Sequence, residues 1–137
     1  LLKVIENTQL LGRWQQLQSN PKVFCDTAHN KEGLVYVLKQ LKEQEFKQLH
    51  IVLGFVKDKN LDGIIKLFPL DATYYFCQPN ISRALEGVVL QSIFKNYNYN
   101  GKVYSSVNNA YKAALKNAKN EDFIFVGGST FVVAEIL

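Results

Sequence analysis

The stretch Val23-Phe24-Cys25-Asp26-Thr27-Ala28-His29-Asn30 decides the fold of this chain. It begins with an apolar run and continues with a carboxylate, an imidazole and an amide. A short buried strand that ends in polar groups is typical of an open parallel α/β sheet, which binds ligands at the carboxyl ends of its strands. We therefore expect Asp26, His29 and Asn30 to lie at such an edge.

Strand-like and helix-like segments alternate along the rest of the chain. Apolar runs predict strands at 22–25, 49–53, 73–77, 102–105 and 123–126. Apolar residues at helical spacing predict helices at 32–45, 61–68, 85–93 and 107–118, and a final helix that starts at Ser129. Pro69 is expected to end the second of these helices, because proline cannot continue the helical hydrogen bonds.

These elements predict a Rossmann-like α/β domain with three layers. Strands that are apolar on both faces, separated by amphipathic helices, are typical of a mostly parallel sheet with helices on both faces. Residues 13–17 are expected to add an antiparallel edge strand, which brings the sheet to about six strands. We expect residues 12–137 to form this domain and residues 1–11 to be the remnant of an interdomain linker.

The composition limits the function classes. With 137 residues, 47% of them hydrophobic and 20% charged, the chain is expected to fold as one domain. No apolar run reaches the ~20 residues that cross a bilayer, so we expect no membrane partner. The net charge of +4 comes from scattered lysines, whereas nucleic-acid-binding surfaces concentrate them, so we expect no nucleic acid partner.

The start of the chain and its cysteines indicate a compartment. The sequence has no methionine and no signal-peptide pattern at its start, so we expect a piece of a longer cytoplasmic protein. We expect that protein to be a monomer. Cys25 and Cys77 fall in predicted buried strands and are expected to be free thiols, with a disulfide or a metal pair as the alternative. Because no CxxC or His/Cys cluster occurs in the sequence, we expect no metal held by this domain alone.

Polar residues follow the predicted strands. The carboxyl ends of parallel strands share one edge, so these residues are expected to gather into a ligand site. The candidates are Asp26, His29, Asn30, Asp58, Lys59, Arg83 and Ser129. Glycines at 54, 127 and 128 would let backbone N–H groups approach a ligand.

Each candidate also has a structural interpretation. Asp, Asn and Ser commonly cap helices and turns, and solvated turns often carry His, Lys or Arg. These alternatives apply to Asp26, His29, Asn30, the segments 54–59 and 127–129, and Arg83. Trp14 is expected to pack against the core instead of stacking on a ligand.

No motif in this sequence supplies catalysis by itself. The sequence contains no GxxxxGK[ST] phosphate loop and no Ser/His/Asp set at a known motif spacing. Any chemistry at the predicted edge therefore requires another domain or another chain.

Two motifs together carry a family resemblance. Gly12-Arg13-Trp14-Gln15 and Asp26-x-Ala28-His29-Asn30 resemble the C-terminal domain of the folylpolyglutamate synthase/dihydrofolate synthase family, in the Mur ligase superfamily. Weaker support comes from Gly54-x-x-x-Asp58-Lys59, Ser82-Arg83-Ala84 and Gly128-Ser129. The sequence departs from the family pattern at Lys31, which replaces the proline after AHN, and at Asn60, which replaces the second aspartate of DKD.

The resemblance implies an ATP-dependent amide ligase that adds L-glutamate to folate through an acyl phosphate. It assigns ATP binding to Arg13 and Asp26, and glutamate positioning to His29 and Ser129. The supporting positions are Asn30, Asp58, Lys59 and Arg83. A P-loop ATPase domain, absent from this sequence, would precede residue 12 and bind most of the Mg²⁺, and reduced folate or dihydropteroate would be the other substrate.

The resemblance assigns no catalytic residue to this domain alone, so the domain by itself is expected to be inactive. Two alternatives remain open. One is the C-terminal domain of a cell-wall Mur ligase, which shares the AHN run, although Gly12-Arg13-Trp14-Gln15 favours the folate branch. The other is a non-catalytic α/β binding module.

Overall fold

A six-stranded sheet forms the centre of the molecule in the computed structural model, which describes residues 11–137. The strands are β1 (Gln15–Ser19), β2 (Lys22–Cys25), β3 (Leu49–Leu53), β4 (Thr73–Phe76), β5 (Gly101–Val103) and β6 (Phe123–Gly127). Their order is β1-β2-β6-β3-β4-β5, and β1 runs antiparallel to β2 while the other pairs are parallel. The predicted mostly parallel sheet with an antiparallel edge strand is confirmed. The linker predicted at 1–11 lies outside the described residues except for Leu11.

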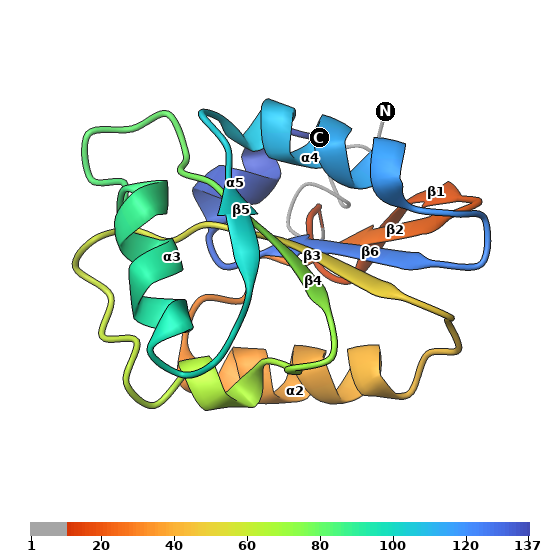
Figure 1. Ribbon diagram of the computed structural model, residues 1–137, viewed down its shortest axis with the longest axis horizontal. Coiled ribbons are helices and arrows are strands. Elements are labelled where there is room, and N and C mark those ends of the chain that lie inside the picture. The colour runs from red at the N-terminus through yellow and green to blue at the C-terminus, as the bar shows by residue number, and fades with distance from the viewer. Residues whose placement is uncertain (1–10) are drawn as a thin grey trace, which may run out of the picture.

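Helices cover both faces of this sheet, as predicted. They are α2 (Lys31–Lys42), α3 (Gly87–Lys95), α4 (Val107–Asn117) and α5 (Thr130–Ala134), together with the 3-10 turn η1 (Ile65–Leu67). Figure 1 shows α4 and α5 above the sheet and α2 below it. The final helix begins directly after Ser129, which caps it, so its predicted start is confirmed.

Several predicted elements differ from the structure; among them, the edge strand predicted at 13–17 is observed at Gln15–Ser19, and the helix predicted at 32–45 ends at Lys42. The prediction of a helix at 61–68 is wrong. The Leu61 carbonyl accepts from the N–H groups of both Ile64 and Ile65, and the segment forms turns that end in the short 3-10 helix η1. The helix predicted at 85–93 begins at Gly87, because the N–H of Leu85 donates to the carbonyl of Phe55 in another loop. The strand predicted at 102–105 is observed at Gly101–Val103, where it pairs with β4.

Two apolar clusters fill the space between the layers. Side chains alternate between the faces of a strand, so consecutive residues of β3 and β6 belong to different clusters. One cluster contains residues of α2, η1 and α3 with Ile51, Leu53, Phe123 and Phe125 of the sheet. The other contains residues of α4 and α5 with Val52, Ile124 and Val126. Burial of both faces explains why these strands are continuous apolar runs in the sequence.

The connections place a crevice at the carboxyl ends of the strands. The chain leaves β2 and β3 towards the cluster that contains α2 and η1, whereas it leaves β6 towards α5 in the other cluster. Because β6 lies between β2 and β3, the loops of neighbouring strands diverge there. Such topological switch points are where open α/β sheets bind ligands.

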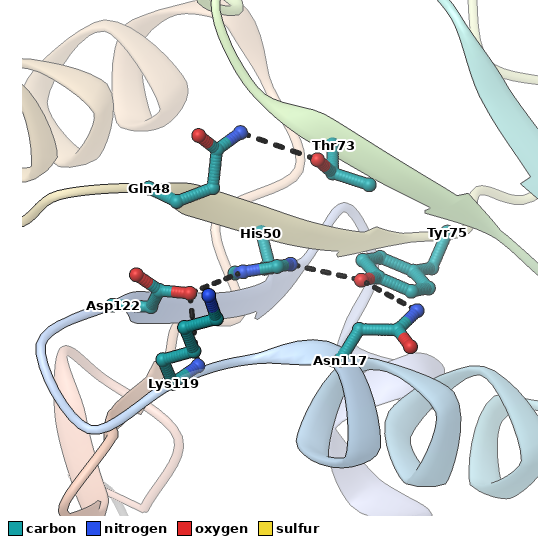
Figure 2. A network of polar contacts seen from close by, with 7 residues as sticks. All are labelled: Gln48, His50, Thr73, Tyr75, Asn117, Lys119 and Asp122. Carbon is teal, nitrogen blue, oxygen red and sulfur yellow. Dashed lines mark hydrogen bonds and ion pairs between the residues drawn. The ribbon is translucent and has the colours of Figure 1, made fainter.

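A buried polar network crosses the opposite, amino-terminal part of the sheet (Figure 2). His50 lies in the middle, with Nε2 at 3.0 Å from Asp122 Oδ2 and Nδ1 at 2.8 Å from the Tyr75 hydroxyl. The Asn117 side-chain amide donates to the same hydroxyl over 3.3 Å. A proton on Nε2 satisfies every group, because it donates to the carboxylate and leaves Nδ1 to accept from Tyr75. This network ties β3, β4, α4 and the start of β6 together.

Candidate functional site

Two cavities lie at the predicted ligand edge and share His29. The first has a volume of about 530 Å³, and the residues that line it include Arg13, Trp14, Asp26, His29, Asn30 and Tyr36. The second has a volume of about 280 Å³ and is lined by His29, Val56, Asp58, Lys59, Arg83, Gly128, Ser129, Thr130 and Phe131. The structure therefore places Arg13, Asp26 and His29 around one cavity, and Ser129 with the charged candidates around the other.

The loop before β1 presents Arg13 to the first cavity. Arg13 is exposed and lies between Gly12 and Trp14, whose φ angles of +76° and +44° are both in the left-handed region. This region costs a residue with a side chain roughly 1–2 kcal/mol, so the conformation of Trp14 requires compensating contacts. Trp14 packs with its ring centroid 4.7 Å from that of Phe24, which is the packing expected from the sequence.

Asp26, which directly follows β2, provides contacts that compensate for the strained backbone of Trp14. Its side chain is 4% exposed, and its two carboxylate oxygens accept from the backbone N–H groups of Trp14 and Ala28, each over 2.7 Å. The next residue, Thr27, donates its backbone N–H to the Gly12 carbonyl over 2.7 Å. The motif that contains Arg13 and the motif that begins at Asp26 are thus one hydrogen-bonded unit.

The start of α2 follows directly from this unit. Asn30 has extended backbone angles and caps the helix, because its Oδ1 accepts from the Gly33 N–H over 2.8 Å. The capping alternative for Asn30 is therefore observed. His29 lies one residue before the cap and is exposed, with Nδ1 at 3.4 Å from the Thr27 carbonyl oxygen. Its ring is free to meet a ligand from either cavity.

The end of β6 approaches the loop after β3 very closely. Gly128 has φ +100°, and a Cβ there would overlap the carbonyl oxygen of Gly54. Only glycine fits this position without strain. Ser129 is 3% exposed and its Oγ accepts from the Phe131 N–H over 3.0 Å, which caps α5. The hydroxyl proton of Ser129 remains available to donate to a ligand.

Arg83 reaches the second cavity through a pairing of two loops. The Lys57 N–H donates to the Arg83 carbonyl over 2.7 Å, which fixes the segment after β4 against the segment after β3. The guanidinium lies 5.6 Å from the centroid of the Phe131 ring, a cation–π contact, and 4.0 Å from a carboxylate oxygen of Asp58. Both charged groups are more than half exposed, so the ion pair with Asp58 adds little stability.

The second cavity has an excess of groups that attract anions. Lys59 and Arg83 each carry a positive charge there, against the single carboxylate of Asp58, and His29 adds a further donor. The first cavity is lined by the exposed Arg13 and the buried Asp26. Such surroundings suit carboxylate or phosphate ligands.

The cysteines do not supply a nucleophile to this site. Both are free and buried, as predicted. Burial, with the nearby charge of Asp26, raises the pKa of the Cys25 thiol to about 11. Burial, with the charge of Glu135, raises the pKa of the Cys77 thiol to about 12. Neither thiol therefore forms the reactive thiolate at neutral pH.

Two absences concern only the part of the chain that the structure describes. Among residues 11–137, no group of three or more His, Cys, Asp or Glu side chains is arranged to hold a metal ion. In the same range, no helix has both the length and the apolar character needed to span a membrane.

Sequence reasoning missed several residues that line the cavities, among them Tyr36, Val56 and Phe131. Tyr36 is 68% exposed, although its neighbour Val37 faces the core. A large aromatic residue on the outer face of an amphipathic helix was the available signal. Phe131 gave no signal, because the last apolar segment of the sequence shows no clear amphipathic pattern.

Comparison with known proteins gives a family match over most of the chain. The family model described as "Mur ligase, glutamate ligase domain" matches residues 12–130. A dihydrofolate synthase/folylpolyglutamate synthase of Buchnera aphidicola subsp. Acyrthosiphon pisum is 32% identical over 137 residues, which cover 98% of this chain and 33% of that protein. The chain therefore spans about a third of the length of this relative.

Solved structures share the fold. Escherichia coli FolC in complex with DHPP and ADP superposes with a TM-score of 0.83 at 28% identity, over 92% of this chain and 30% of that one. A bifunctional folylpolyglutamate synthase/dihydrofolate synthase with Mn, AMPPNP and L-glutamate bound superposes with a TM-score of 0.80 at 22% identity, over 91% of this chain and 30% of that one. At this lower identity the second comparison shows the fold alone.

Proposed function

The chain belongs to the Mur ligase glutamate ligase domain family, and we propose that it is the amino-acid-positioning domain of a cytoplasmic folylpolyglutamate synthase/dihydrofolate synthase. The relatives from Buchnera aphidicola and Escherichia coli described above are about three times as long as this chain. The remaining part of the ligase includes a P-loop ATPase domain, which closes over the carboxyl edge of this sheet. Residues 12–137 form the second half of the active site.

One observation carries this proposal. His29 lines both cavities, so the cavity that contains Arg13 and Asp26 and the cavity that contains Lys59, Arg83 and Ser129 meet at a single residue. A ligase that joins an activated carboxyl group to an amino acid needs this arrangement, because the two reacting groups must come within about 3–3.5 Å. A module that binds one ligand does not need two neighbouring cavities.

The reaction has two steps. The γ-phosphoryl group of ATP is transferred to a carboxylate of the pteroate or folate substrate, which gives an acyl phosphate and ADP. The amine of L-glutamate then attacks the acyl carbon, phosphate leaves, and the amine loses a proton. Both steps depend on positioning and on stabilisation of negative charge. Mg²⁺ supplies charge neutralisation on the phosphates when bound in the ATPase domain, and we assign no metal ligand to residues 11–137.

The residues of this chain act by binding and orientation. Arg13 binds an ATP phosphate, a task that suits the planar donors of a guanidinium, and Asp26 contributes to ATP binding. His29 and Ser129 position the glutamate, the serine through its free hydroxyl proton. Arg83 and Lys59 attract the carboxylates of glutamate into the second cavity.

An activity assay of the full-length ligase tests this function. ATP-dependent addition of L-glutamate to dihydropteroate or to a reduced folate supports it, and the choice between these substrates separates the two folate activities. Turnover of a UDP-muramyl substrate instead would assign the chain to the cell-wall branch. No turnover of either kind, with binding of a ligand by the chain alone, would favour a binding module. Residues 1–137 by themselves are expected to form no amide product and no ADP.

A further inference from the structure

We propose that Lys31 forms a carboxylate subsite beside the proposed glutamate site, and that this subsite binds the glutamyl tail of a folate substrate. The ligand group is the α-carboxylate of a glutamyl residue that the folate already carries. The inference rests on the proposed function as a folate ligase. It adds to that function a residue that favours glutamylated folates over dihydropteroate.

A third cavity adjoins the two cavities at the ligand edge. It has a volume of about 380 Å³, and the residues that line it include Lys31, Lys59, Asn60 and Gly63. It shares Asn30 with the first cavity, and Asp58 and Lys59 with the second. A substrate that reacts between the first two cavities therefore has the third within reach.

The side chain of Lys31 crosses this third cavity. Lys31 is the first residue of α2 and is exposed. A Cβ on Gly63 would lie 3.9 Å from Cδ and 4.0 Å from Nζ of Lys31, so the lysine extends from α2 to the turn that contains Gly63. The ion pairs within the described range 11–137 do not include Lys31. Its ammonium group is therefore available to an anionic ligand.

The charges around the third cavity favour an anion. Lys31 and Lys59 contribute two positive charges, against the single carboxylate of Asp58. That carboxylate also has a second cation nearby, because the guanidinium of Arg83 lies 4.0 Å from it. An excess of ammonium groups in a cavity suits a carboxylate.

Asn60 adds a neutral donor to the same cavity. Its Oδ1 accepts from the Asp62 N–H over 3.1 Å, which leaves the side-chain NH₂ group to donate to a ligand. Lys31 and Asn60 are the two positions at which the sequence departs from the family pattern, where proline and aspartate are usual. Both departures make the cavity more positive, so the carboxylate subsite is a property of this chain.

The glutamyl tail is the substrate group that still lacks a partner. The second cavity already offers two cations, Lys59 and Arg83, to the two carboxylates of the incoming L-glutamate. The phosphates of ATP are assigned to Arg13 in the first cavity. A glutamylated folate carries an α-carboxylate close to the γ-carboxylate that is activated, and the activated group must come within about 3–3.5 Å of the glutamate amine. Dihydropteroate has only the carboxylate that reacts.

The test compares kcat/KM of the full-length ligase for dihydropteroate and for tetrahydrofolate with one or three glutamyl residues. Lys31→Gln is expected to lower kcat/KM for the glutamylated folates by about threefold to tenfold, between the effect of an exposed ion pair and that of a charge-assisted hydrogen bond. It is expected to leave kcat/KM for dihydropteroate, and KM for ATP and L-glutamate, within about twofold. Lys31→Arg is expected to keep at least about half of the wild-type value for every substrate.

Two controls separate the subsite from a general loss of positive charge. Lys39→Gln removes an exposed lysine of the same helix that lines none of the three cavities, and is expected to leave all constants within about twofold. Gly63→Glu places a carboxylate beside Lys31 and is expected to reproduce the loss for glutamylated folates by competing for the ammonium group. Gly63→Gln is of similar size without the charge and is expected to have little effect.

Several results would overturn the subsite alone. These are an equal loss for dihydropteroate and the glutamylated folates, no loss for any substrate, or a raised KM for L-glutamate, which would assign Lys31 to the incoming amino acid. Turnover of dihydropteroate without turnover of any glutamylated folate would also overturn it. If the wild-type ligase turns over none of these substrates, the proposed function fails, and the subsite fails with it.

Discussion

Asp122→Ala should destabilise this domain strongly, although Asp122 is far from the proposed ligand edge. Its carboxylate accepts from His50 Nε2 and from the Lys119 N–H, at 3.0 Å and 2.9 Å (Figure 2). Alanine leaves the buried His50 donor without an acceptor, at a cost of about 1–3 kcal/mol, and removes the bond to the partly buried Lys119 N–H, which is worth about 0.5–1.5 kcal/mol. Because part of this is relieved by relaxation, we expect a loss of about 2–4 kcal/mol in the free energy of unfolding. For a chain of this size that lowers Tm by roughly 6–16 °C.

The neighbouring residue provides a matched control. Glu121 forms an ion pair with Lys47 at 3.4 Å, but both side chains are about 70% exposed. Glu121→Ala should therefore cost less than about 0.5 kcal/mol. Urea unfolding followed by circular dichroism measures both variants. Equal losses for Asp122→Ala and Glu121→Ala would refute the argument that burial gives the network its value.

The same carboxylate makes stability depend on pH. Burial alone would raise the pKa of Asp122, but hydrogen bonds from the Lys119 N–H, His50 and the Gln48 N–H together hold it below its ordinary value. A lowered folded-state pKa stabilises the fold above the unfolded pKa of about 4, and this contribution is lost as the pH falls through the folded-state pKa. The stability difference between wild type and Asp122→Asn should be constant above about pH 5 and shrink below about pH 4. A difference that instead grows on acidification would contradict the direction of the shift.

Further predictions concern the ligand edge and the core. Arg83→Ala should raise KM for glutamate by about tenfold in the full-length ligase, and Phe131→Leu by a smaller factor, because leucine removes the cation–π contact and leaves the guanidinium; unchanged KM in both would exclude Arg83 from the glutamate site. Gly128→Ala should destabilise the chain by about 2 kcal/mol or more, measured by thermal unfolding, since its φ of +100° and the adjacent carbonyl oxygen leave no room for a Cβ. Cys25 and Cys77 should react with a thiol reagent at pH 7.5 only as fast as the chain unfolds, because their pKa values are raised to about 11 and 12; rapid labelling of the native chain would contradict their burial.

Local patterns in the sequence predicted most of the fold because each element is long enough to show its period. The strand at 49–53 and the helix that begins at residue 107 coincide with β3 and the start of α4. The segment at 61–68 misled because its apolar spacing is helical, whereas Gly63 and the nearby Pro69 leave too few residues to form a helix with a stable nucleus. The helix predicted to start at Leu85 starts two residues later, because the Leu85 N–H donates to the carbonyl of Phe55 in a distant loop. No local sequence pattern can reveal such a bond.

The candidate site was predictable in its membership but not in its internal contacts. Parallel strands bring Asp26, His29 and Ser129 to one edge, so their proximity follows from topology. The bond from the Trp14 N–H to Asp26 spans twelve residues and depends on an antiparallel register that the sequence does not specify. His50 lies within an apolar strand and was not singled out in the sequence, although a buried polar group almost always has a hydrogen-bond partner. The identity of that partner, 72 residues away, required the structure.

Polar interactions are used differently at the two ends of this sheet. At the amino end, the side chains of His50, Tyr75 and Asp122 bond with one another and are closed to solvent. At the carboxyl end, Asp26, Asn30 and Ser129 accept from backbone N–H groups, and so fix loops while the ligand-facing side chains stay exposed. This division would serve the proposed function, because rigid loops keep the orientation of exposed cations at low entropic cost. Asp122→Ala should accordingly lower Tm without changing KM for ATP at temperatures below the transition.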